Sequence, residues 1–98
     1  MSTPSRVEKT PSGLAFFGDI DHQSIPGLMQ RLPAVDASSV EFDLSACDKI
    51  DSAGLAFMID WGNRHLSSEQ KISLRGVSPQ LRRLIEIMGL ESVFALSD

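Results

Sequence analysis

Residues that would support disulfides, membrane spans or binding to polyanions are scarce in this sequence. The 98 residues include one cysteine, Cys47, so no disulfide can form within the chain, and a reducing, cytoplasmic compartment is expected. The longest apolar run, residues 53–59, is far shorter than the roughly 20 residues that span a bilayer, and the opening residues lack the apolar stretch of a secretory signal. Nine Lys and Arg stand against thirteen Asp and Glu, which disfavours nucleic acid and anionic lipid as partners. We therefore expect no nucleic-acid partner and no direct insertion into a membrane.

The rest of the composition is that of one small globular domain. Hydrophobic residues make up 42% of the chain and charged residues 22%, which suits a single core with a superficial site. The apolar spacing predicts strand 13–18, helix 24–32, strand 40–44, helix 52–67, strand 71–77 and helix 78–88. Residues 1–12 are expected to form a loose N-terminal arm or an edge strand, and residues 13–98 the domain itself. Such alternation is typical of α/β folds built on βαβ units.

Capping residues and helix breakers mark the ends of these elements. Asp21 or Ser24 is expected to begin the first helix and Ser78 the last, which Gly89 ends. The segments without a periodic pattern are a polar loop, a turn and a closing element, at residues 45–51, 67–70 and 93–96. The elements follow one another without a long linker, as expected of a single domain.

The segment KIDSAGLAFMIDW places small and polar residues where a loop meets a helix. Asp51 lies in the position of an N-cap, and Ser52, Ala53 and Gly54 follow in the first turn. Helix N-termini expose unpaired amide hydrogens, which suit capping carboxylates, phosphate groups and partner contacts. Capping alone is the commoner role of such an aspartate. The junction is therefore a candidate contact site.

The run IDSAGL, preceded by VEFDL, resembles the signature of the STAS domain family (sulfate transporter and anti-sigma factor antagonist). The order and spacing of GLAFFGDID, LRGV and SPQLRRLIEIMGLESVF extend this resemblance from Leu14 to Leu96. The resemblance implies a single STAS-like α/β domain with a small mixed sheet and helices packed on it. In the antagonist branch a regulatory serine lies two positions after the aspartate, where this chain has Ala53. Ser52 could carry a phosphate instead, but it points about 100° away around the helix.

A hydroxyl residue after the aspartate and a small residue before the glycine look more like the MlaB branch of the family. That branch comprises the STAS subunits of Mla phospholipid-transport ABC transporters, which support outer-membrane lipid asymmetry. The resemblance implies a cytoplasmic subunit, peripheral to the inner membrane, that binds the ATPase in a complex with a permease and a lipid carrier. Carried over by position, Ser52 is the residue that matters for assembly. The alternative is an anti-sigma factor antagonist or related signalling domain controlled by serine phosphorylation.

The helix after Asp51 shows two apolar stripes. Around the helix axis, the first stripe lies within about 60° of Leu55 and contains Met58, Ile59, Gly62 and Leu66. The second stripe, Phe57 and Trp61, lies roughly on the opposite side. We predict that the second stripe is exposed, because aromatic residues on an outer face have the character of binding hot spots. The predicted partner-binding surface is Asp51, Ser52, Ala53, Gly54, Phe57, Trp61 and Arg64. It could also mediate self-association when the partner is absent. The alternative is that the first or last helix covers both aromatics.

Motifs for catalysis are missing from the sequence. There is no G-x-S-x-G elbow to make Ser52 a nucleophile, and neither G-x-x-x-x-G-K-[ST] nor G-x-G-x-x-G to hold a nucleotide. Asp19, Asp21 and His22 could be imagined as metal ligands, but carboxylates around a turn are common capping groups. We therefore expect a non-catalytic protein with no cofactor and no metal.

Overall fold

The computed structural model describes residues 5–32, 40–66 and 72–97. Within these ranges the chain forms a five-stranded sheet and three helices. In chain order the elements are β1 (Arg6–Thr10), β2 (Gly13–Ile20), α1 (Ile25–Gln30), β3 (Glu41–Ile50), α2 (Ser52–His65), β4 (Ile72–Arg75), α3 (Pro79–Ile87) and β5 (Phe94–Ser97). The predicted alternation of strands and helices is confirmed, and the closing element is a strand. The turn predicted at residues 67–70 lies outside the described residues.

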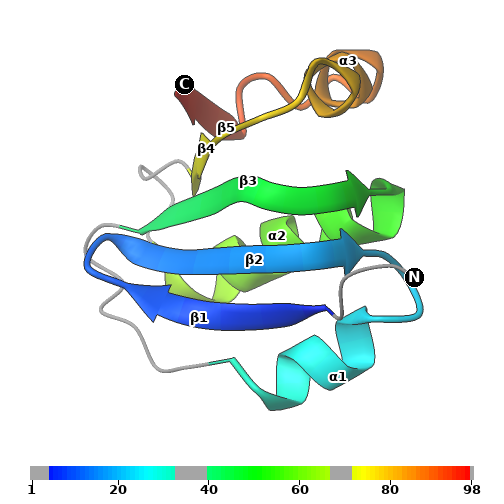
Figure 1. Cartoon of the computed structure of the whole chain (residues 1–98). Coiled ribbons are helices and arrows are strands. Elements are labelled where there is room, and N and C mark those ends of the chain that lie inside the picture. Colours follow the sequence, from blue (N-terminus) through cyan, green and yellow to red (C-terminus); the bar gives the residue numbers. More distant parts are fainter. Residues whose placement is uncertain (1–4, 33–39, 67–71, 98) are drawn as a thin grey trace.

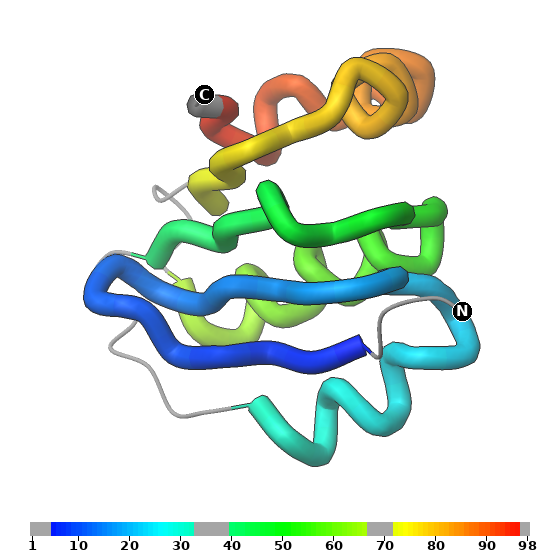
Figure 2. The backbone as a smooth tube through the Cα atoms, in the orientation of Figure 1, coloured from blue at the N-terminus to red at the C-terminus, as the bar shows by residue number. Residues whose placement is uncertain are grey.

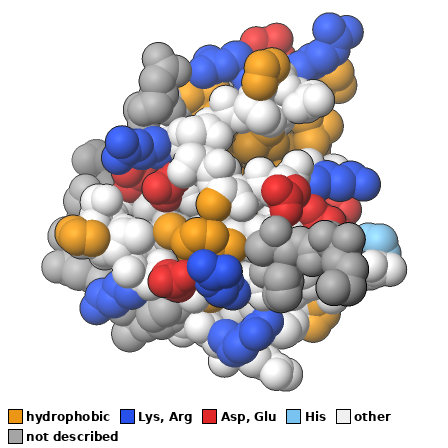
Figure 3. Space-filling model, viewed as in Figure 1, with side chains coloured by type: hydrophobic (Ala, Val, Ile, Leu, Met, Phe, Trp, Pro, Cys, Tyr) orange, Lys and Arg blue, Asp and Glu red, His pale blue; other side chains and the backbone are white. Residues whose placement is uncertain are grey.

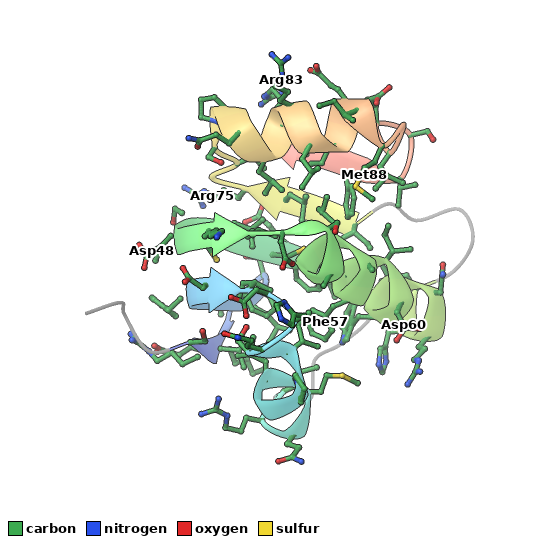
Figure 4. All side chains as sticks on the ribbon, turned by 90° about the vertical axis from the view of Figure 1, so that its right-hand side faces the viewer. Asp48, Phe57, Asp60, Arg75, Arg83 and Met88 are labelled. Atoms are coloured by element: carbon green, nitrogen blue, oxygen red, sulfur yellow. The ribbon has the colours of Figure 1, made fainter. Side chains whose placement is uncertain are left out.

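The strands lie side by side in the order β1-β2-β3-β4-β5. β1 pairs antiparallel with β2, and the remaining neighbours pair in parallel, so the sheet is mixed, as expected. In Figure 1, α2 lies behind β2 and β3, α1 lies beside β1, and α3 is seen nearly end-on beyond β3. Figure 4 places α1 and α2 on the same side of the sheet. Because β2 and β3 are parallel, both end at the same edge, where α1 and α2 begin.

The edge strand β1 continues the sheet across the domain boundary expected at residue 12. Thr10 pairs with Gly13, and Arg6 pairs with Phe17. The guanidinium carbon of Arg6 also lies 3.9 Å from the centroid of the Phe17 ring, within the range of a cation–π contact. Of the two forms predicted for the N-terminal segment, residues 6–10 therefore take the strand.

The core lies between the sheet and α2. Phe16 of β2 and Phe42 of β3 are fully buried, with ring centroids 5.3 Å apart. From α2, Phe57 lies 6.3 Å from Phe16 and Trp61 lies 5.1 Å from Phe42, centroid to centroid. Edge-to-face pairs of this kind add about 0.5–1.5 kcal/mol each to the gain from apolar burial. These four residues form the aromatic cluster, which fixes the rotation of α2 on the sheet.

The predicted ends of the last helix are confirmed. Ser78 is the N-cap of α3, and its Oγ accepts a hydrogen bond from the backbone N–H of Leu81 at 3.1 Å. Gly89 follows the helix one residue after its C-cap. No helix in the described part of the chain is long and apolar enough to span a membrane.

β3 is much longer than the sequence predicts. We expected a strand over residues 40–44 and a polar loop over residues 45–51, whereas β3 continues to Ile50. Its pairing with β2 runs to Ile20 opposite Ile50, with register irregularities along the way. The loop prediction is wrong because the second half of β3 is largely exposed, and an exposed strand segment does not need the apolar alternation that a half-buried one shows.

Candidate functional site

The candidate site lies where β3 ends and α2 begins. Asp51 is the N-cap of α2, and its Oδ1 accepts a hydrogen bond from the backbone N–H of Gly54 at 2.9 Å. The backbone N–H of Asp51 donates in turn to the carbonyl oxygen of Ile20 at 3.3 Å. The first bond closes the first turn of α2, and the second attaches that turn to the end of β2. The predicted capping role of Asp51 is confirmed.

Gly54 lets this first turn sit directly on the sheet. A Cβ atom at this position would lie 2.6 Å from the carbonyl oxygen of Ile20 and 2.8 Å from Cγ2 of Ile50. Both distances are shorter than van der Waals contact, so the close approach requires glycine. Gly54 is buried, and it therefore supports the site from beneath instead of contacting a partner.

The turn before α1 borders the same edge. Nδ1 of His22 lies 3.8 Å from Oδ2 of Asp51, with the His22 side chain largely exposed. Asp21 accepts backbone N–H bonds from Ser24 at 2.9 Å and from Gln23 at 3.0 Å, and the bond from Ser24 holds the pKa of the Asp21 carboxyl below its ordinary value. Ser24 occupies the N-cap position of α1 without a side-chain capping bond. Of the two residues expected to begin the helix, Ser24 is the N-cap, and the Asp21 carboxylate holds the turn that leads into it.

The outward face of α2 is polar and carries small side chains. Four of its exposed residues, Ser52, Ala56, Asp60 and Asn63, form what we call the outer face. Ala53 is half-buried beside it, and exposed Arg64 forms an ion pair with Asp60 at 3.2 Å. Of the predicted binding residues, the structure therefore brings Ser52, Ala53 and Arg64 to the surface of one helix. Ala56 and Asp60 belong to the same surface and were missed.

Phe57 and Trp61 do not line this surface. The prediction that they form an exposed stripe is wrong, because they are 8% and 6% exposed and belong to the aromatic cluster. In Figure 4, Phe57 lies between α2 and α1, whereas Asp60 lies on the outer side of α2. The buried stripe offers no surface through which two copies could associate.

The error has an identifiable cause in the helical wheel. The prediction centres the buried arc on Leu55, whereas Leu55 lies near one border of a buried arc that extends through Trp61 to Phe57. The polar residues carried the correct signal. On the helical wheel, the mean direction of Ser52, Asp60 and Asn63 is about 90° from Leu55. The side of the helix opposite to this direction, close to Trp61, is the buried side.

Comparison with known proteins identifies the family of this chain. A family model described as "Mlab, STAS domain" matches residues 5–96. The chain belongs to this STAS domain family. A crystal structure of an anti-sigma factor antagonist from Mycobacterium paratuberculosis is similar to this STAS domain, with a TM-score of 0.71 and 30% sequence identity, over 98% of this chain and 89% of that chain. No curated protein matches the chain.

The resemblance inferred from IDSAGL is therefore confirmed, as is the α/β fold that it implied. In this STAS domain the position of the antagonist branch's regulatory serine is held by Ala53, which is half-buried and has no hydroxyl. The hydroxyl of the neighbouring Ser52 is exposed at the start of α2. A side chain at position 52 can therefore contact a partner without any change in the core.

Proposed function

We propose that this STAS domain is a non-catalytic subunit that binds and stabilises or regulates the ATPase of an Mla-type phospholipid-transport ABC system. The family model described as "Mlab, STAS domain" supports the assignment to this branch. In such a system the protein is cytoplasmic and is held at the inner membrane through its partner. Its role in outer-membrane lipid asymmetry is then indirect, since the ATPase supplies the chemistry.

The outer face of α2 is the surface we assign to the ATPase. Ser52, Ala56 and Asp60 are exposed on a helix whose opposite side is fixed by the aromatic cluster. Small side chains at the start of the helix allow another backbone to approach closely, and a rigid helix holds its contacts in one geometry. A binding surface of this kind needs no movement of the STAS domain.

The alternative is a signalling STAS domain of the anti-sigma factor antagonist type. The similarity to the antagonist from Mycobacterium paratuberculosis favours it. Its switch would have to use Ser52, because Ala53 cannot be phosphorylated. A phosphate on Ser52 would lie at the N-terminus of α2, where the helix dipole favours negative charge.

Purification of the tagged protein at its native expression level, followed by mass spectrometry, separates the two functions. We expect an ABC ATPase together with its permease to copurify. A small kinase-like protein in their place, or stoichiometric phosphate on Ser52 after incubation with that kinase, would contradict the proposal. Ser52→Ala should bind the ATPase more weakly than wild type, and unchanged binding would remove Ser52 from the site.

A further inference from the structure

The proposed function does not use a groove beside α3. This groove has a volume of about 650 Å³ and lies between the second half of β3 and α3. The apolar side chains that line it come from both elements: Leu44, Cys47 and Ile50 from β3, and Leu81, Leu84 and Ile87 from α3. Figure 3 shows hydrophobic side chains gathered beneath α3, with charged side chains around them.

The groove exists because β4 stops early. β4 pairs with β3 only from Glu41 to Asp43, and at Ser45 two features end the ladder. The backbone N–H of Ser45 donates to Oδ1 of Asp43 at 3.0 Å. Gly76, with φ of 73°, passes directly over the backbone of Ser45. A Cβ atom at position 76 would lie 2.7 Å from Cα of Ser45. Figure 2 shows the chain leaving β4 and turning away from β3 towards α3.

The consequence is an open strand edge inside an apolar groove. Among the residues that the structure describes, no strand lies along residues 45–50 of β3 on the side of α3. This segment is about 20 Å long at the usual rise per residue. A strand without a neighbour presents backbone N–H and C=O groups that an extended chain can pair with, while pockets beside it receive alternate side chains.

We propose that this groove binds an extended segment of a partner protein, which adds a strand to the sheet beside β3. The open edge favours a peptide over a small apolar molecule, because only a peptide backbone can pair with the backbone of β3. Ile87 is 71% exposed at the groove, and an incoming apolar side chain would cover it. The proposal concerns a different surface from the outer face of α2 and does not depend on the identity of the ATPase.

The charges of the groove define the segment further. Its charged lining residues are the basic Lys49 and Arg83 and the acidic Asp48, whereas the whole chain carries a net charge of −4. Neither Lys49 nor Arg83 forms an ion pair with another described residue. The segment is therefore expected to alternate apolar side chains with polar ones and to include an acidic residue near these two cations.

Cys47 serves as part of the apolar wall. Its Sγ donates to the carbonyl oxygen of Phe16 at 3.3 Å. Burial, together with the charges of Asp48, Asp43 and Asp19, raises the pKa of the Cys47 thiol to about 12. The thiol therefore stays protonated at neutral pH and presents a neutral surface to the segment.

Selection from a phage-displayed library of random peptides tests the proposal. Peptides of about eight residues are long enough to span the open edge with a residue to spare at each end. We expect enriched peptides with alternating apolar residues and at least one acidic residue. Ile87→Glu should weaken their binding by about tenfold or more, since a charge would be buried against apolar side chains. Hydrogen exchange should show new protection at those amides of residues 46–50 that face the open edge of β3 in the bound protein.

The neighbouring Met88 supplies the matched control, because it is exposed at the C-cap of α3 but does not line the groove. Met88→Glu should bind the selected peptides as wild type does. Failure to enrich any peptide, equal binding by Ile87→Glu, or protection confined to α2 would overturn the proposal. A dimer of the free protein that Ile87→Glu dissociates would also overturn it, since the occupant would then be a second copy of this chain.

Discussion

The two faces of α2 differ in burial, in side-chain size and in polarity. The inner face carries Phe57, Trp61 and Gly54, all buried against β2 and β3. The outer face carries Ser52, Ala56, Asp60 and Asn63, all exposed. Large aromatic residues in this STAS domain therefore hold the helix in place, while small and polar residues are left for contacts. Substitutions on the inner face should change stability, and those on the outer face should change binding alone.

The largest effect is expected at the centre of the inner face. Trp61→Ala removes a ring that packs on Phe42 at 5.1 Å and should lower the free energy of unfolding by about 3–5 kcal/mol. Arg64→Ala, one turn away on the exposed side, should change it by less than about 0.5 kcal/mol. Urea denaturation followed by circular dichroism measures both. If Trp61→Ala kept wild-type stability and lost only its partner, the indole would be a contact residue after all.

A smaller effect is expected where the inner face meets the end of the sheet. Gly54→Ala forces a Cβ atom towards the carbonyl oxygen of Ile20 and should cost about 1–3 kcal/mol of stability. Gly27→Ala in α1 is the matched control, because its nearest neighbour is the flexible Arg31 side chain at 3.4 Å. It should be neutral or stabilising by up to about 1 kcal/mol. Thermal unfolding should give a lower melting temperature for Gly54→Ala than for Gly27→Ala. Equal melting temperatures for the two variants would contradict the close packing of α2 on the sheet.

Asp51 lies at the boundary between the two faces of α2. Its substitution should lower the stability of the domain less than changes on the inner face and more than changes on the outer face. Asp51→Ala removes the acceptor of the Gly54 N–H bond and should lower stability by about 1 kcal/mol. Asp51→Asn keeps an acceptor oxygen and should retain most of that stability. The free energies of unfolding of the two variants can be compared by urea titration. Identical losses for Ala and Asn would show that charge rather than capping is what Asp51 contributes.

Local sequence signals were sufficient for most of the fold. The capping roles of Asp51 and Ser78, and the stop at Gly89, depend on neighbours within a few residues, so they could be predicted. The length of β3 could not be predicted in this way. Residues 45–50 are held by pairing with β2, which is far away in the sequence, and carry little apolar pattern of their own.

The rotation of α2 was the main error in the candidate site. Apolar residues occupy more than half of the helix circumference, so their positions alone left the buried direction undefined. The exposed residues Ser52, Asp60 and Asn63 would have defined it from the sequence. The early end of β4 could not be predicted from local spacing, because it depends on Gly76 crossing Ser45, two residues far apart in the chain.

We propose that the outer face of α2 binds the ATPase, and a charge placed on that face tests this most directly. Ala56→Arg places a large charged side chain on that face at an exposed position, so stability should change by less than about 0.5 kcal/mol. Gln30→Arg adds the same charge to an exposed position at the end of α1 and serves as the control. In a binding titration with the copurified ATPase subunit, we expect an affinity loss of about tenfold or more for Ala56→Arg and none for Gln30→Arg. Wild-type affinity in a folded Ala56→Arg variant would contradict it.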